Sequence, residues 1–287
     1  MLSRGRFLGS SFVLLSGCAR RGRGAVDVAL AGFAGHCAVF AGRIRASQAQ
    51  YCYERNADAR IPAASLAKLL VAISVADQVR ARSLHRDDVV RVSARVERLA
   101  GSEAWGLVHP RLTVSDLLGA MISISDNFAS NALIELLGVE HINASALRLG
   151  LRVLRVHGYY VDSPDTVPPR TFATARDMLA ILTCIGDGAN DPEALTRGVY
   201  LQILDSMYRQ DDRRIIRAAL PPSVSAANKT GEIANVINDV AIIEPMSADP
   251  AFIIIMADKI AALNTASYED EISALRRLAR ALYDECI

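Results

Sequence analysis

The order in which two kinds of apolar pattern occur along the chain constrains its fold more than any other feature. Residues 26–45 and 48–55 are rich in small and β-branched residues, which predicts two strands around a turn. Four later segments have apolar residues three and four positions apart, which indicates helices: 66–82, 112–124, 127–138 and 173–185. Strand character then returns in three segments, 223–233, 236–245 and 251–259, and a helical pattern over 268–285 closes the chain.

This order favours an α+β fold in which both ends of the chain build one sheet. The simplest packing is an antiparallel sheet flanked by N- and C-terminal helices, with an all-helical subdomain from the middle of the chain. We assign residues 34–60 and 215–287 to the α/β part and residues 61–214 to the helical part. A cleft would form where the two parts meet, which is a usual place for a binding site.

Length and charge agree with one large folded body. The 287 residues are 51% hydrophobic, enough to bury a substantial core. The formal net charge is +1, so nothing in the overall charge favours nucleic acid as a partner.

The first residues have the three parts of an export leader. MLSRGR is a basic start, FLGSSFVLL is an apolar stretch too short to span a bilayer, and LSGC is a small-residue junction. The segment resembles a bacterial lipoprotein leader, in which residues 1–17 are removed and Cys18 is acylated. Residues 18–33 would then link a lipid anchor to a domain over 34–287, outside the cytoplasm and on a membrane surface. The alternatives are an ordinary secretory peptide and a misassigned start.

Export permits disulfides among the four remaining cysteines, Cys37, Cys52, Cys184 and Cys286. Cys37 and Cys52 could face each other across a hairpin that turns near residues 43–46, so we consider that pairing. No C-x-x-C pair or histidine cluster is present. We therefore expect neither a metal nor another cofactor.

Lysine is rare in this chain. Of 32 basic residues only three are lysines: Lys68, Lys229 and Lys259. Arginine stays charged at any working pH, whereas a buried lysine can lose its proton. A chain that avoids lysine and still uses it at position 68, inside an apolar run, suggests an amine that titrates there.

The first lysine belongs to the segment IPAASLAKLL. Ser65 and Lys68 lie three positions apart at the start of a predicted helix, so they share one face. The first turn of a helix has unpaired N–H groups that favour negative charge, such as the oxyanion formed when a serine attacks an amide carbonyl. Alternatively, Ser65 is a helix N-cap and Lys68 is a surface side chain.

Two further motifs complete the pattern. Ser125, Asp126 and Asn127 stand between two predicted helices, where they could equally be capping and turn residues. NKTGE, residues 228–232, begins an apolar strand and contains the second lysine. By itself it could be the rim of a hairpin.

Together, S-x-x-K, S-D-N and K-T-G resemble the motifs of class A serine β-lactamases and their penicillin-binding relatives. The resemblance runs from about residue 34 to the C-terminus and includes residues 101–138 around S-D-N and 219–245 around K-T-G. It implies a β-lactamase/transpeptidase-like fold and an active site between its two parts.

The resemblance also implies chemical roles. Ser65 would be the nucleophile that becomes acylated, and Lys68 its base, with a pKa lowered partly by the charge of Lys229. Ser125 would pass a proton to the leaving nitrogen. The backbone N–H groups of Ser65 and Glu232 would form the oxyanion hole.

The remaining motif residues would hold the substrate. Asn127 would bind the amide of its side chain, and Lys229 and Thr230 its carboxylate. Gly231 would let the strand approach the nucleophile without an intervening side chain. Asp126 would brace its own loop.

The chain departs from the class A pattern at two places. No glutamate lies between Glu140 and Glu193, where these enzymes carry the residue that activates the deacylating water. Asp162 or Asp165 could replace it, or both could be loop-capping residues, whereas Asp177 fits a helix-capping pair with Thr174. The strand after K-T-G reads NVINDV and lacks the arginine that many class A enzymes place there.

Three functions remain open from the sequence. The first is a hydrolase that opens β-lactams, and the second is a D-Ala-D-Ala peptidase that acts on cell-wall stem peptides by the same chemistry. The third is a lipid-anchored binding protein with a relict site. For each we expect a monomer that does not bind nucleic acid.

Overall fold

The computed structural model describes residues 24–31, 33, 35–45, 48–99, 111–160, 171–261 and 265–287. Cys18 and the whole predicted leader lie outside the described residues, and so do Asp162 and Asp165.

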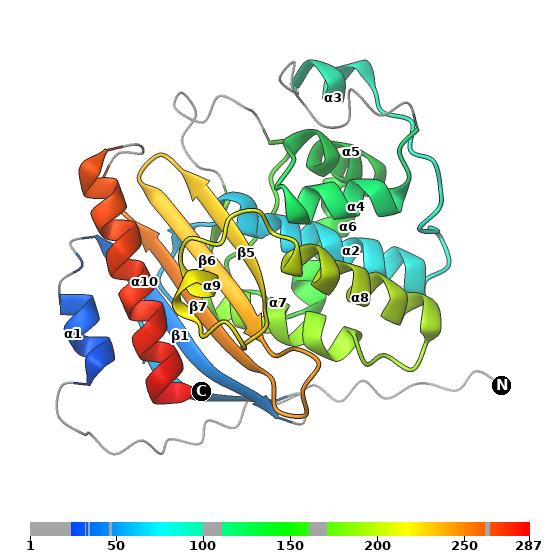
Figure 1. The fold of residues 1–287 in the computed structure, drawn as a ribbon. Helices are drawn as coiled ribbons and strands as arrows, with labels where there is room; N and C mark the ends of the chain where they lie inside the picture. The colour runs from blue at the N-terminus through cyan, green and yellow to red at the C-terminus, as the bar shows by residue number, and fades with distance from the viewer. Residues whose placement is uncertain are drawn as a thin grey trace.

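A five-stranded antiparallel sheet joins the two ends of the chain, as the sequence predicts (Figure 1). Its strand order is β2-β1-β7-β6-β5. The strands are β1 (His36–Arg45), β2 (Gln48–Arg55), β5 (Ala226–Ile233), β6 (Val236–Ile243) and β7 (Ala251–Asp258). The K-T-G strand β5 is therefore an edge strand, free on one side to face the helical part.

The sheet is buried on both faces, which explains the continuous apolar runs of β6 and β7. Alternate residues of these strands belong to two separate hydrophobic clusters. Ile253 and Ile255 pack under the C-terminal helix α10 (Ala266–Cys286), whereas Ile254 and Met256 pack toward the helical part. A strand with both faces covered shows no polar alternation.

The helical part surrounds one buried helix, α2 (Lys68–Arg80), which follows the short 3₁₀ turn η1 (Ala64–Ala67). Every residue from Lys68 to Ala76 is buried. The helices around it are α3 (Ala94–Leu99), α4 (Val114–Ser123), α5 (Asn127–Leu137), α6 (Val139–Arg148), α7 (Ala175–Gly188) and α8 (Ala194–Tyr208). A short pair, β3 (Ile61–Pro62) and β4 (Phe172–Ala173), and the helix α9 (Ile216–Ala219) complete the fold.

The N-terminal boundary differs from our expectation. Residues 26–31, which we predicted as strand and within a linker over 18–33, belong to a helix, α1 (Ala25–Ala31). This helix packs against α10, with Val26 and Leu30 buried (Figure 1). The alternating small and β-branched residues fit either structure, and packing on α10 selects the helix.

The predicted Cys37–Cys52 pairing is wrong, because Cys52 is bonded to Cys286 and Cys37 is a buried free thiol. Ala41 pairs with Tyr53 and Gly42 with Tyr51, so Cys52 is the extra residue of a β-bulge and has no partner in β1. Cys37 lies beyond Val39, which pairs with Arg55. The bond instead joins the edge strand to the last turn of α10.

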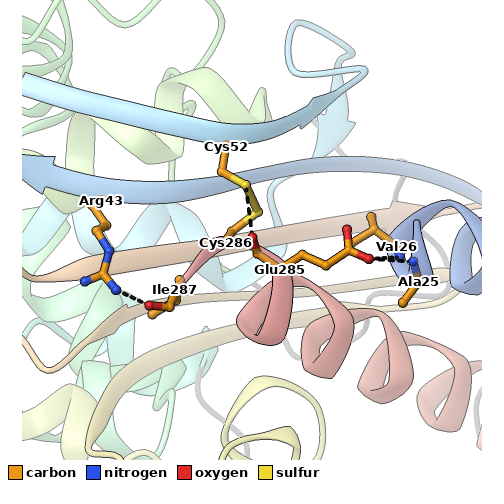
Figure 2. Close-up of a disulfide and its surroundings, with 7 residues drawn as sticks. All are labelled: Ala25, Val26, Arg43, Cys52, Glu285, Cys286 and Ile287. Atoms are coloured by element: carbon orange, nitrogen blue, oxygen red, sulfur yellow. Dashed lines mark hydrogen bonds between the residues drawn. A yellow bond between two sulfur atoms is a disulfide. The ribbon is translucent and has the colours of Figure 1, made fainter. Parts of the chain in front are cut away.

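The disulfide belongs to a C-terminal clamp formed by Glu285, Cys286 and Ile287 (Figure 2). The Glu285 carboxylate accepts hydrogen bonds from the first N–H groups of α1, at 2.5 Å from Ala25 and 3.4 Å from Val26. Arg43 in β1 donates to the carbonyl of Ile287. Three consecutive residues thus hold α1, β1 and β2 together. Within the described residues, the helices are too short or too polar to cross a membrane.

We expect replacement of both Cys52 and Cys286 by serine to lower the free energy of unfolding by about 2–4 kcal/mol, because the bond closes a long loop. Urea denaturation measures this change. Reductant should destabilise the wild type to a similar extent and leave the double variant unaffected. An unchanged wild-type midpoint under reductant would contradict the bond.

Candidate active site

The site forms where β5 meets the turn that precedes α2. Gly231 lies so close to this turn that a Cβ there would stand 2.9 Å from the Ala63 carbonyl oxygen and 3.1 Å from the Ser65 nitrogen. Only glycine permits such an approach of two backbones. The backbone beside Lys229 and Thr230 is thereby brought against the N-terminal end of the Ser65 turn, as we predicted for Gly231.

Ser65 lies in η1 and is partly exposed. Ala64 before it has a φ of 47°, a left-handed conformation that is strained for a residue with a Cβ. Asn238, buried in β6, donates hydrogen bonds to the carbonyls of Pro62 (3.0 Å) and Ala63 (3.3 Å). Sequence reasoning missed this anchor, although a polar residue inside the apolar strand VINDVAII was its signal.

Lys68 is completely buried in the first turn of α2. Its Nζ donates to the Ser125 carbonyl (2.5 Å) and to Asn127 Oδ1 (2.8 Å), and lies 3.2 Å from Ser125 Oγ. A neutral amine has two N–H groups and one lone pair. The two oxygen acceptors can take both N–H groups of a neutral amine.

Lys229 is also completely buried, and its Nζ lies 3.1 Å from the same Ser125 Oγ. The Ser125 hydroxyl therefore stands between two amines from different parts of the fold. Ser125 itself has a φ of 56°, again in the left-handed region. The structure thus brings together one residue from each of the three predicted motifs.

Burial lowers the pKa of Lys229 to about 7, against the attraction of Asp239 and Asp212, which raises it. A buried ammonium loses hydration, so its neutral form gains stability. Near neutral pH this amine is therefore divided between its two protonation states.

A polar layer that the sequence analysis missed supports Lys229. Asp239, fully buried in β6, accepts hydrogen bonds from Asn228 Nδ2 (3.0 Å) and from the Ile216 nitrogen (2.9 Å). Burial raises the pKa of Asp239 above its usual range. Asn228 also donates to the Asp212 carbonyl (3.1 Å), which holds the segment before α9 beside the K-T-G strand.

The segment before α9 supplies an arginine near the site, although the strand after K-T-G has none. Arg214 Nη2 lies 2.5 Å from Glu232 Oε2, and the same guanidinium forms two bonds of 2.9 Å with Asp212. The hydroxyl of Tyr268 in α10 donates to Glu232 Oε1 (2.6 Å). Glu232, whose backbone N–H is expected in the oxyanion hole, is therefore held through contacts to both of its carboxylate oxygens.

Two predicted supporting residues are found in structural roles. Asp126 is the N-cap of α5 and accepts a hydrogen bond from the Ala129 nitrogen (2.6 Å), so it braces its loop as expected. Thr174 caps α7 by accepting from the Asp177 nitrogen (3.0 Å). The Asp177 carboxylate accepts from the nitrogens of residues 152–154, so this pair is only half of a capping box.

Tyr160 is a further neighbour that the sequence analysis did not identify. Its ring centroid lies 4.8 Å from Lys68 Nζ. Tyr160 is the second tyrosine of the segment HGYY, residues 157–160, which contains none of the predicted motifs. Among the described residues, no group of three or more His, Cys, Asp or Glu side chains could hold a metal ion.

Comparisons with known proteins agree with this geometry. The sequence model of a family described as "Beta-lactamase enzyme family" matches residues 24–286. The chain is 30% identical over 214 residues to "Beta-lactamase AST-1" of Nocardia asteroides. The aligned residues cover 71% of this chain and 66% of that protein, just under two thirds of its length.

Solved structures show the same fold. A β-lactamase from Sphaerobacter thermophilus superposes with a TM-score of 0.74 at 25% identity, covering 90% of this chain and 93% of the other. A β-lactamase from Burkholderia vietnamiensis gives a TM-score of 0.75 at 21% identity, covering 91% and 94%. The antiparallel sheet with a helical subdomain is confirmed as the fold class.

We expect the Lys229 amine to titrate with a midpoint near pH 7, because burial disfavours its charged form. Labelling lysine with ¹³C at Cε gives only three signals to resolve, and Lys229→Arg and Lys259→Arg assign two of them. The amine is protonated below the midpoint and neutral above it. Asp239→Asn should lower the midpoint further, since the carboxylate attracts the ammonium. A signal that stays constant from about pH 6 to 9 would contradict the assignment.

Proposed function

This chain belongs to the β-lactamase enzyme family, and we propose that it opens the amide bond of β-lactams through an acyl-enzyme on Ser65. The observation that carries this proposal is the placement of two buried lysine amines beside the one hydroxyl of Ser125. One of these amines, Lys68, lies three positions after Ser65 in the chain. A surface lysine or a simple helix cap would not need such burial.

The geometry supports a complete acylation step. Lys68 in its neutral form takes the proton of Ser65 Oγ, which attacks the β-lactam carbonyl carbon and forms a C–O bond. The oxyanion accepts hydrogen bonds from the Ser65 and Glu232 nitrogens. The C–N bond breaks as Ser125 Oγ gives its proton to the leaving nitrogen, and Ser125 recovers a proton from Lys68.

The K-T-G strand supports binding of an anionic substrate. Protonated Lys229 is a buried positive charge beside the Thr230 side chain at the edge of the sheet. In a water-poor site a charge of this kind attracts a carboxylate more strongly than it would in bulk solvent. Both β-lactams and D-Ala-D-Ala ends carry a carboxylate next to the amide that is cleaved.

A second function, D-Ala-D-Ala peptidase, is favoured by one observation. No glutamate lies between Glu140 and Glu193, so the chain lacks the usual activator of the deacylating water. An enzyme that acylates well and releases slowly resembles a penicillin-binding protein. The adduct lifetime with a β-lactam, followed by an assay on stem peptides, distinguishes the two functions.

We expect intact-mass spectra to show an adduct equal to the full mass of an added β-lactam, because ring opening loses no atoms. Ser65→Ala should form none. Ser125→Ala should slow acylation about 100-fold through loss of proton transfer. Ser123→Ala is a matched control, since among the described residues the Ser123 hydroxyl donates to the Gly119 carbonyl of its own helix, and it should acylate as the wild type does. An adduct on Ser65→Ala would contradict the assigned nucleophile.

We further propose that the protein is exported and held on a membrane surface through acylated Cys18. The leader pattern favours this, and the Cys52–Cys286 bond supports an oxidising compartment, because the cytoplasm keeps thiols reduced.

In a bacterium that processes lipoproteins, we expect the wild-type protein in the membrane fraction and Cys18→Ser in the soluble exported fraction, because the acyl chains supply the membrane affinity. Immunoblots of the fractions measure the distribution. Cys184→Ser, at a cysteine of the folded body, is the control and should stay membrane-bound. Equal distribution of the Cys18 variant and the wild type would contradict the anchor.

A further inference from the structure

Asn131 fixes the backbone of Tyr160 against the active-site helix α5. The Tyr160 nitrogen donates to Asn131 Oδ1 (2.7 Å), and Asn131 Nδ2 donates to the Tyr160 carbonyl (2.8 Å). Asn131 is completely buried and lies one helical turn after Asn127. The position of residue 160 relative to the S-D-N motif is therefore set by a rigid element.

The Tyr160 ring packs against Lys68, the proposed base of acylation. The Tyr160 ring centroid is 4.8 Å from Lys68 Nζ, within the range of a cation–π contact. Desolvation raises the pKa of the phenol, so at neutral pH the side chain is uncharged. It contributes an aromatic surface beside Lys68 and no general base.

Release of an acyl group needs a base in this same neighbourhood. A water oxygen must attack the Ser65 ester carbonyl and form a new C–O bond while a base takes its proton. The Ser65 Oγ–C bond then breaks, the serine oxygen is reprotonated and a carboxylic acid leaves. Ser65 and Lys68 share one face at the start of the central helix, so a group packed on Lys68 lies on the face that carries the ester.

We propose that Tyr160 sets the lifetime of the acyl-enzyme by filling the space beside Lys68 with an uncharged ring where a water and its base would otherwise stand. This inference rests on the proposed function. Tyr160 acts here through the water and through Lys68, so it is a positioning residue. It gives the site the character of an acyl-retaining enzyme.

The test compares acylation and deacylation rates by intact-mass time courses with a β-lactam. Tyr160→Glu places a carboxylate at residue 160, whose backbone Asn131 holds in place. We expect deacylation to accelerate about tenfold or more, since a well-placed general base contributes about 10²–10⁴-fold. Tyr160→Gln has the same length without the charge, and should not reproduce this gain. Tyr160→Phe keeps the ring and should preserve the wild-type lifetime. Thermal melting of each variant shows whether it is folded.

The outcomes separate this inference from the proposed function. Absence of any adduct on the wild type overturns both. A wild-type adduct that decays as fast as that of Tyr160→Glu overturns the inference alone, and so does equal acceleration by the Gln and Glu variants. If Tyr160→Glu does not fold, Tyr160→Gly decides: it opens the space to water, and an unchanged adduct lifetime overturns the inference. Asp162→Asn and Asp165→Asn are measured in parallel. If either variant releases the acyl group more slowly than the wild type does, that aspartate is the base, and the inference about Tyr160 is also overturned.

Discussion

The burial of two lysine amines around the Ser125 hydroxyl is the constraint on which the rest of the structure depends. Moving an ammonium out of water costs several kcal/mol unless its N–H groups find acceptors. Lys68 has the Ser125 carbonyl and Asn127 Oδ1, and Lys229 has the Thr230 carbonyl at 2.8 Å. For Lys229 the burial cost that remains favours the neutral amine and lowers its pKa to about 7.

No single element could build this arrangement. Lys68 comes from the central helix, Ser125 from a strained turn between helices, and Lys229 from the edge of the sheet. Ser125 lies 57 residues from Lys68 and 104 from Lys229. Asn238 and Gly231 bring the sheet against the Ser65 turn, while Asn228 and Asp239 support Lys229 from behind. The site is thus a property of the contact between the two parts of the fold.

The far end of the sheet is held by a different means. The C-terminal clamp ties α1 and the two N-terminal strands to the last turn of α10 through a disulfide, a capping carboxylate and an arginine (Figure 2). Among the described strands β2 is at the edge of the sheet, so a covalent bond there limits fraying. The C-terminal clamp lies apart from the candidate active site, which is at the opposite edge strand, β5.

The sequence by itself determined the fold class, the placement of the sheet at both ends of the chain, and the candidate residues Ser65, Lys68, Ser125 and Lys229. It could do so because apolar periodicity reports local structure and because lysine is so rare here that its positions carry information. Tertiary structure alone decided the partner of Cys52, since a one-residue bulge removes it from its strand neighbour. It also decided the helical state of residues 26–31, which depends on α10. The contacts of Asn238, Asp239, Arg214 and Tyr160 likewise became visible only in three dimensions, because each acts through a residue distant in the chain.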